Sequence, residues 1–229
     1  MKSPRGSPKV RRVNALRAAW FSVAFAGCAS VGSVQRADTL GTGNLEVGLE
    51  PGAQVYAGQR GAAPLPHVDA SLRIGVSERV DLGVRVGVPW AEVQAKVLLT
   101  TPGAPRLAIS LAPSFGGTVL PVNGSIAKVL HGALPVLIGF KFGEHELVLG
   151  PRLMAYGTLE AMGSVVLAPG ATVGVAFQLT NTFGLMPEVG FVVPVIGLSG
   201  MGLSAAQTGA ISTIGQLKLG LLIGRHRAR

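Results

Sequence analysis

Apolar and polar side chains alternate along most of the chain with a period of two residues. In residues 80–88 (VDLGVRVGV), valine or leucine occupies every second position, with Asp81, Gly83, Arg85 and Gly87 between them. An amphipathic helix would instead repeat its apolar residues every three or four positions. Because successive side chains of a β-strand point to opposite faces, the pattern predicts strands with one apolar face and one face of small and charged residues.

Segments of this kind recur along the body of the chain, and most approach the length of a tilted transmembrane strand, about 9–11 residues. The ten segments lie at 44–56, 66–76, 80–88, 90–100, 106–117, 133–142, 145–156, 164–179, 183–195 and 212–224. We predict an all-β fold, an antiparallel up-and-down transmembrane β-barrel of about ten strands, with eight or twelve strands as the alternatives.

The connections between these segments alternate in length. Those after the second, fourth, sixth and eighth segments are short, whereas 57–65, 118–132 and 196–211 are long. Short turns at one end and longer loops at the other are typical of outer-membrane barrels. Only the connection near Pro89, after the third segment, is too short for this scheme.

Aromatic residues fall near both ends of the predicted strands. Those near the long loops are Tyr56, Trp90, Phe115 and Tyr156, and those near the short turns are Phe142, Phe177 and Phe183. Aromatic rings gather at the two membrane–water interfaces of such barrels. We therefore expect these residues to form two girdles on the outer surface.

The composition excludes several classes of protein. The 229 residues include 33 glycines and 15 prolines, only 14% charged residues and a single cysteine. A disordered chain would be more polar, and long helices tolerate glycine and proline poorly. One cysteine excludes a disulfide framework and a cysteine-based zinc site.

Two other folds remain open on the pattern alone. A soluble β-barrel or sandwich would turn the charged face outward, but that face is largely Gly, Ala, Ser and Thr, which make a poor soluble exterior. Helical membrane spans would need the uncharged runs 107–127, 161–187 and 189–217, and glycine and proline interrupt each of them.

The net charge of +9 arises at the two ends of the chain. Residues 1–27 contain six basic residues and no acidic one, and the basic tail 225–229 adds three arginines. Acids and bases balance in the residues between these ends. Nucleic-acid binding needs basic residues clustered on a folded face, so we expect no nucleic-acid partner.

Residues 1–27 have the organisation of a signal peptide. A basic region is followed by the apolar stretch 18–27, which is too short to cross a bilayer as a helix. The stretch leads into residues 25–28 (FAGC), which resemble the lipobox of bacterial lipoproteins. This resemblance implies cleavage before Cys28 and a covalent lipid on its thiol, with 28–43 as a flexible linker. An ordinary secretory signal cut nearby is the alternative.

Residues 44–224 resemble, in overall pattern, the small outer-membrane β-barrels of Gram-negative bacteria, the OmpA-like group in the broad sense. The resemblance implies a barrel in the outer membrane, surrounded by outer-membrane lipids and inserted by the barrel assembly machinery. One departure concerns the last strand, which in that group usually ends in Phe or Trp. Here it ends in Leu222-Ile223-Gly224.

The face opposite the apolar one carries acids and bases in balance. Its charged residues are Glu46, Glu50, Asp69, Arg73, Asp81, Arg85, Glu92, Lys96, Lys141, Arg152, Glu188 and Lys218. Buried charges need partners, so these residues predict a charge network that fills and rigidifies a narrow lumen. A selective pore lined by the same charges is the alternative.

Catalytic, metal and cofactor motifs are weak in this chain. His67, Asp69 and Ser71 share one strand face near a long loop, where barrel-embedded hydrolases place such residues. Side chains two positions apart on a strand lie about 6.5–7 Å from each other along it, too far for a Ser–His hydrogen bond. The scattered histidines show no metal-ligand spacing, and nothing indicates a cofactor.

We therefore expect a lipid-anchored outer-membrane barrel that is not an enzyme. Its role would be structural, passive transport or surface interaction. The alternatives are a narrow small-solute pore and a lipid hydrolase with its site at the rim.

Overall fold

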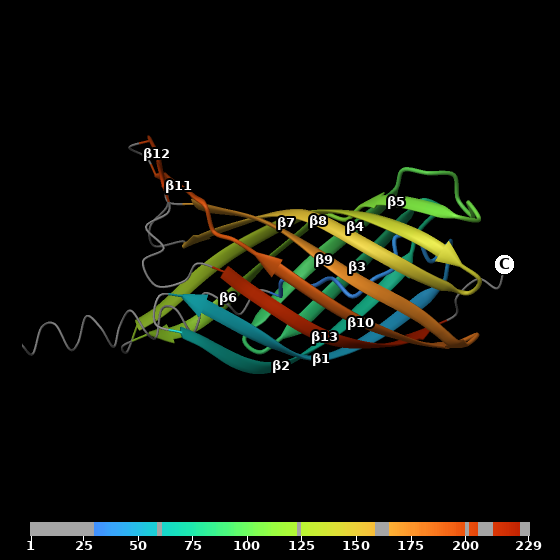
Figure 1. Ribbon diagram of the computed structural model, residues 1–229, viewed down its shortest axis with the longest axis horizontal. Helices are drawn as coiled ribbons and strands as arrows, with labels where there is room; N and C mark the ends of the chain where they lie inside the picture. The colour runs from blue at the N-terminus through green and yellow to red at the C-terminus, as the bar shows by residue number, and fades with distance from the viewer. Residues whose placement is uncertain are drawn as a thin grey trace, which may run out of the picture.

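The computed structural model describes residues 30–58, 61–122, 125–158, 165–199, 202–205 and 213–224. They form a closed antiparallel β-barrel (Figure 1). The wall strands are β1 (Leu45–Gly58), β2 (Gly61–Gly75), β3 (Val80–Gly87), β4 (Trp90–Leu98), β5 (Leu107–Leu111), β6 (Ser114–Val122), β7 (Ser125–Phe142), β8 (His145–Thr158), β9 (Val165–Thr180), β10 (Phe183–Val192) and β13 (Thr213–Gly224). A small hairpin, β11 (Ile196–Ser199) and β12 (Gly202–Ala205), pairs with β9 and projects from one end.

The barrel closes because the last strand pairs on both of its edges. β13 lies between β1 and β10, and each remaining wall strand pairs with its neighbours. β5 and β6 together make one wall strand, interrupted at Ala112 and Pro113, and both pair with β4 and with β7. The structure therefore confirms the predicted barrel of ten strands.

The two ends of the barrel differ. The connections 76–79, 99–106, 143–144 and 181–182 gather at one end, called here the turn end, and Gly224 lies there too. The opposite end carries β11 and β12 and is called the hairpin end (Figure 1, left). The turn at Val88 and Pro89 also faces the hairpin end, where Gly87 pairs with Trp90.

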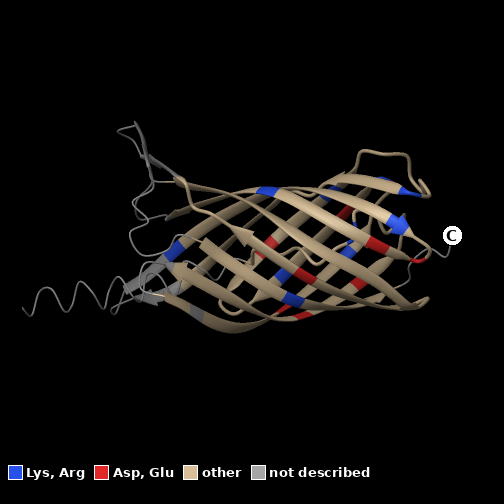
Figure 2. Cartoon of the chain, in the orientation of Figure 1, with Lys and Arg blue, Asp and Glu red and all other residues tan. Residues whose placement is uncertain are grey.

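The apolar face of the strands forms the outer surface, as the alternation predicts. Leu72, Val84 and Val93 lie side by side on β2, β3 and β4, and 42%, 46% and 58% of their surfaces are exposed. Arg85, the next residue after Val84, is buried inside. Figure 2 shows the charged residues as isolated patches on an otherwise uncharged wall. No helix in the described residues is long and apolar enough to cross a membrane.

The strands continue through regions that we expected to be long loops. β1 and β2 pair as far as Gly58 and Gly61, within 57–65, and β6 and β7 pair as far as Val122 and Ser125, within 118–132. Part of 196–211 forms the β11–β12 hairpin. Main-chain pairing between antiparallel neighbours extends these strands even where the side-chain alternation fades.

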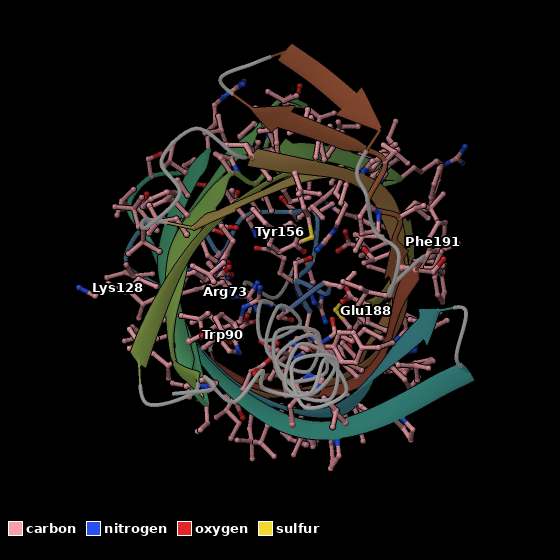
Figure 3. The ribbon with its side chains drawn as sticks, turned by 90° about the vertical axis from the view of Figure 1, so that its left-hand side faces the viewer. Arg73, Trp90, Lys128, Tyr156, Glu188 and Phe191 are labelled. Atoms are coloured by element: carbon pink, nitrogen blue, oxygen red, sulfur yellow. The ribbon has the colours of Figure 1, made fainter. Side chains whose placement is uncertain are left out.

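Three of the expected girdle aromatics point into the barrel. Tyr56 and Trp90 are 6% and 5% exposed, and Tyr156 also turns inward (Figure 3). Phe115 and Phe142 do face outward, with about half of their surfaces exposed. The expectation was wrong for the first three because their positions in the period-two repeat place them on the charged face. Inside, Tyr56 donates a hydrogen bond to Gln54, and Tyr156 donates one to Met154 Sδ.

The segment expected to be a flexible linker, 28–43, instead lies inside the barrel over residues 30–41, and residues 42 and 43 are exposed. Val31, Val34 and Ala37 have no exposed surface. Residues 30–40, called here the lumen segment, run lengthwise through the lumen, and the chain leaves it at the turn end, where Gly43 N donates to Gly75 O (2.7 Å). The linker prediction was wrong because nothing in the segment's own alternation shows what surrounds it. The predicted signal peptide 1–27, Cys28 and the tail 225–229 lie outside the described residues.

Candidate functional site in the lumen

Glycines on the inner face of the wall make room for the lumen segment. A Cβ atom added to Gly220 would lie 2.0 Å from Val34 Cγ1, and one added to Gly139 would lie 2.8 Å from Ala37 Cβ. Any larger side chain at these positions would therefore collide with the segment. The wall is shaped to leave space for the lumen segment.

Acidic side chains of the wall accept hydrogen bonds from main-chain N–H groups of the segment. The two carboxylate oxygens of Glu188, on β10, accept from Ser33 N (3.0 Å) and Val34 N (3.2 Å). Glu146, at the start of β8, accepts from Ala37 N (2.9 Å). Asp81 on β3 binds Leu40 N in the same way (3.1 Å).

Basic side chains donate to main-chain carbonyl groups of the same segment. Arg73 Nη2 donates to Val34 O (3.1 Å), and Lys96 Nζ donates to the carbonyls of Arg36 (3.3 Å) and Asp38 (2.6 Å). Two further carbonyls are bound in the same way, that of Gly32 by Arg85 and that of Ala37 by the hydroxyl of Ser110. Charged donors and acceptors make stronger hydrogen bonds than neutral ones, so the segment is firmly held.

Charged side chains inside the barrel also form ion pairs. Lys218 is completely buried and lies 2.7 Å from Glu50 Oε2 and 2.5 Å from Asp69 Oδ2. Arg85 and Glu92 approach to 2.5 Å. Arg85 also lies 3.5 Å from Glu50, and further ion pairs join Arg73 to Glu46, Lys96 to Asp81, and Lys141 to Asp38 of the segment. Eleven of the twelve predicted lumen charges are buried inside the barrel, and Lys141 lies partly exposed beside Asp38. Figure 3 shows Arg73 and Glu188 turned toward the centre of the barrel.

Arg152 is the exception to this pairing. It is buried on β8, and its Nε and Nη2 atoms have no hydrogen-bond partner among the described residues. Both carboxylate oxygens of the buried acid Glu188 are instead bound to the lumen segment.

A cavity of about 150 Å³ lies where the segment leaves the lumen. Both wall and segment residues line it, among them Arg36, Glu46, Lys96, Lys141 and Glu146. The charged residues nearest the turn end therefore border a cavity.

Sequence reasoning missed part of this site. Glu146 and Gln216 are buried on the inner face, and both bind the segment. Glu146 and Arg152 are an even number of residues apart on β8, so their side chains share one face, and the alternation could have placed Glu146 inside. The segment itself had no such signal, because its partners come from strands spread over the whole sequence.

The candidate catalytic residues do not form a nucleophile–base pair. His67 Nε2 lies 3.6 Å from Asp69 Oδ2 and 2.8 Å from Gln216 Nε2. Asp69 is held by Lys218, and the Ser71 hydroxyl has no hydrogen-bond partner in the described part of the chain. Over the same residues, no group of His, Cys, Asp and Glu is arranged to hold a metal ion.

No protein-family model and no curated protein matches the sequence. Among solved structures, the chain is similar to an outer-membrane channel from Pseudomonas putida F1 (10% identity, TM-score 0.45, 85% of this chain and 100% of the other). It is also similar to the outer-membrane protease OmpT from Escherichia coli (8%, 0.43, 85% and 100%) and to neisserial surface protein A (11%, 0.33, 78% and 96%). At these identities the likeness concerns the barrel fold alone.

The outer surface decides where this barrel resides. A soluble barrel keeps its apolar side chains inside, whereas here Leu, Val, Ile and Phe side chains surround the outside and the charges are enclosed. A closed wall satisfies every strand edge, which is what a β-structure in lipid requires. The protein is an outer-membrane β-barrel.

Proposed function

We propose that this protein is a passive-transport barrel whose lumen is closed by the lumen segment, residues 30–40. The observation that carries the proposal is the occupant of the lumen: a stretch of the protein's own chain, held there by hydrogen bonds to side chains of the wall. A purely structural barrel needs no such segment, because side chains fill a narrow barrel by themselves.

Withdrawal of the segment would leave a polar channel. Its lining would be the ionised groups that now bind the segment, such as Arg73, Lys96 and Glu188, together with the inward glycines. Because acids and bases are mixed along this lining, we expect passage of small polar solutes with weak charge selectivity.

We further propose that the protein is not an enzyme. The His67–Asp69–Ser71 group lacks the Ser–His hydrogen bond that activates a nucleophile, and its acid is engaged by a buried lysine. Lipid turnover that disappears in Ser71→Ala would contradict this proposal.

The lipid anchor on Cys28 and insertion by the barrel assembly machinery belong to the same proposal. They rest on the lipobox-like sequence and on the barrel fold in contact with outer-membrane lipids. Mass spectrometry of the N-terminal peptide should show a chain that starts at Cys28 and carries about three acyl chains. An unmodified Cys28, or cleavage elsewhere, would refute the anchor and leave the pore untouched.

A reversible disulfide between the segment and the wall tests the proposed pore. An ideal Cβ on Gly220 lies 3.4 Å from Val34 Cβ, close to the spacing of a disulfide, about 3.5–4.5 Å. We propose Val34→Cys/Gly220→Cys in a Cys28→Ser chain, with Val34→Cys alone as the matched control. In planar bilayers, the reduced double variant should open under voltage, should close on oxidation and should reopen with reductant. A reduced protein that never conducts, or one that conducts equally when oxidised, would overturn the proposal.

A further inference from the structure

The polar and charged side chains of the wall form most of their hydrogen bonds to the lumen segment with its main chain rather than with its side chains. Between residues 32 and 40, the bonded N–H groups are those of residues 32, 33, 34, 37 and 40, and the bonded carbonyls those of residues 32, 34, 36, 37 and 38. Main-chain groups are the same in every polypeptide. We propose that the lumen is a binding site for an extended polypeptide main chain, and that an unattached peptide binds there when the lumen segment is displaced.

The charges of the site are arranged for a peptide backbone. Carboxylates meet N–H groups and cations meet carbonyls, so each wall side chain faces the end of the peptide dipole that it attracts. The N–H groups of Ser33 and Val34 share one carboxylate, Glu188, while the carbonyl of Val34 faces Arg73. This matching does not depend on which side chains the bound peptide carries.

Polar side chains of the segment contribute fewer bonds, while Val31, Val34 and Ala37 pack into apolar clusters inside the barrel. The Ser33 hydroxyl is buried and has no hydrogen-bond partner among the described residues. Gln35 accepts a bond from Arg73, Arg36 donates to Gln178, and Asp38 pairs with Lys141, a lysine near the mouth of the turn end. These contacts add affinity at one end of the segment, but the bonds to the main chain extend along most of its length.

The space available in the lumen restricts the size of the peptide's side chains at two positions. A Cβ on Gly32 would lie 2.1 Å from Glu188 Oε1, and Ala37 packs against Gly139, where no side chain intervenes. A peptide ligand therefore needs a residue without a side chain at the first of these positions and a small one five residues later. Its length is that of the segment, because the site runs from Gln216 to Asp81.

While it is seated, the attached segment excludes such a ligand. A tethered segment competes at an effective concentration in the millimolar range, so a free peptide gains access only when the segment is displaced. Gly32→Val should displace it, since the added side chain collides with Glu188 while every wall residue stays unchanged. Ala37→Leu, added to Gly32→Val, provides a second displaced variant with the same wall.

The test measures binding of fluorescent peptides to the full chain in detergent, so that it does not depend on conductance. A peptide of residues 30–42 should bind the Gly32→Val protein at least tenfold more tightly than it binds the unaltered protein. Tryptic cleavage after Arg36 verifies displacement, and heat-modifiable gel mobility verifies the folded barrel.

Two altered peptides separate recognition of the main chain from recognition of side chains. N-methylation at Ser33, Val34 and Ala37 removes the N–H donors and should weaken binding more than tenfold. A peptide with Gln35→Ala, Arg36→Ala and Asp38→Ala should bind within about threefold of the original. The reverse order of affinities, or no binding to either displaced variant, would overturn the inference, even if the barrel proves to conduct.

Discussion

Val84 and Arg85 are consecutive residues of β3 with opposite environments. Val84 is exposed on the apolar outer surface, while Arg85 is buried against Glu92 and the carbonyl of Gly32. Because successive side chains of a strand point to opposite faces, Val84 faces the outside and Arg85 faces the lumen. The same separation holds on β2 and β4, where Leu72 and Val93 flank Val84.

An arginine placed on the lipid side should therefore be costly. Val84→Arg is expected to lower the free energy of unfolding by about 2–4 kcal/mol, as for a cation near the bilayer midplane. Urea unfolding in lipid vesicles measures the difference, and Val84→Leu, which keeps the surface apolar, should be nearly neutral. A harmless Val84→Arg in lipid would mean that the inner and outer faces are exchanged.

Lys218 illustrates the opposite case, a charge that the lumen needs. It is fully buried between Glu50 and Asp69, so Lys218→Met leaves Asp69 without its lysine and Glu50 with Arg85 alone. Removing one partner of a buried ion pair costs about 3–5 kcal/mol, and the same unfolding experiment should show a loss of that size. Lys128→Met, at an exposed lysine that points outward (Figure 3), should change stability by less than about 0.5 kcal/mol. Equal effects of the two substitutions would contradict the proposed role of the network.

At the scale of elements, β13 and the lumen segment pack closely against each other at a glycine. Gly220 lies on the inner face of β13, whose main chain is paired on both sides with β1 and β10. The strand is thus held by its neighbours, whereas the segment is held only by side chains. A side chain at this position should displace the segment and leave the strand in place.

Gly220→Val tests whether an added side chain displaces the segment and leaves the strand in place. We expect trypsin to cut after Arg36 and release a fragment that begins at Ala37, while the barrel keeps its heat-modifiable mobility. Gly215→Val is the matched control on the same strand, because a Cβ there meets only atoms 3.9 Å or more away. It should leave Arg36 protected. Cleavage in both variants, or in neither, would show that Gly220 does not control the seating of the segment.

At the scale of the whole molecule, the barrel has two distinct ends that must face different compartments. Short periplasmic turns and longer surface elements are the usual arrangement. The turn end should therefore be periplasmic and the hairpin end should face the outside. This orientation also returns Gly224 to the side on which β1 begins.

Labelling of single cysteines on intact cells tests the orientation. In a Cys28→Ser chain, cysteines at Ser125 and Ser204, at the hairpin end, should react with an impermeant maleimide. Cysteines at Ser77 and Asn181, at the turn end, should not react. Labelling at Asn181 alone would invert the orientation, and equal labelling at both ends would contradict a membrane-spanning barrel.

The proposed lipid anchor and the seated lumen segment make conflicting demands on the chain. The Ser30 hydroxyl lies 3.4 Å from Gln216 Oε1, and β13 continues from there to Gly224, roughly 20 Å along the barrel axis once strand tilt is included. The two residues back to Cys28 span at most about 7 Å. A lipid on Cys28 therefore cannot enter the periplasmic leaflet at the turn end while the segment is seated.

Acylation should consequently open the barrel. We expect trypsin to cut after Arg36 in the acylated protein and to spare that site in a lipid-free chain refolded from Ala29. Detection of the fragment that begins at Ala37 by mass spectrometry measures the difference. Protection of Arg36 in both forms would place the lipid at the hairpin end instead.

The alternation in the sequence determined the wall of this protein. Period two is a local property of each strand, so it was enough to identify the strand positions, the lipid-facing valines and the inward charges such as Arg85 and Lys218. It could also have assigned Glu146, Tyr56 and Trp90 to the inside. The alternation did not predict where the strands end, because main-chain pairing extends β6 and β7 into residues without a clear alternation.

Only the tertiary structure decided what occupies the lumen. Residues 30–40 are small and polar and lack the period-two pattern, so by themselves they resemble a linker. Their binding partners, among them Arg73, Lys96, Glu146 and Glu188, come from strands far apart in the sequence. Those side chains surround one axis only after the barrel has closed, because closure brings β13 against β1. A pattern within one strand determines which way a side chain points, but the contacts across the lumen depend on the closed wall as a whole.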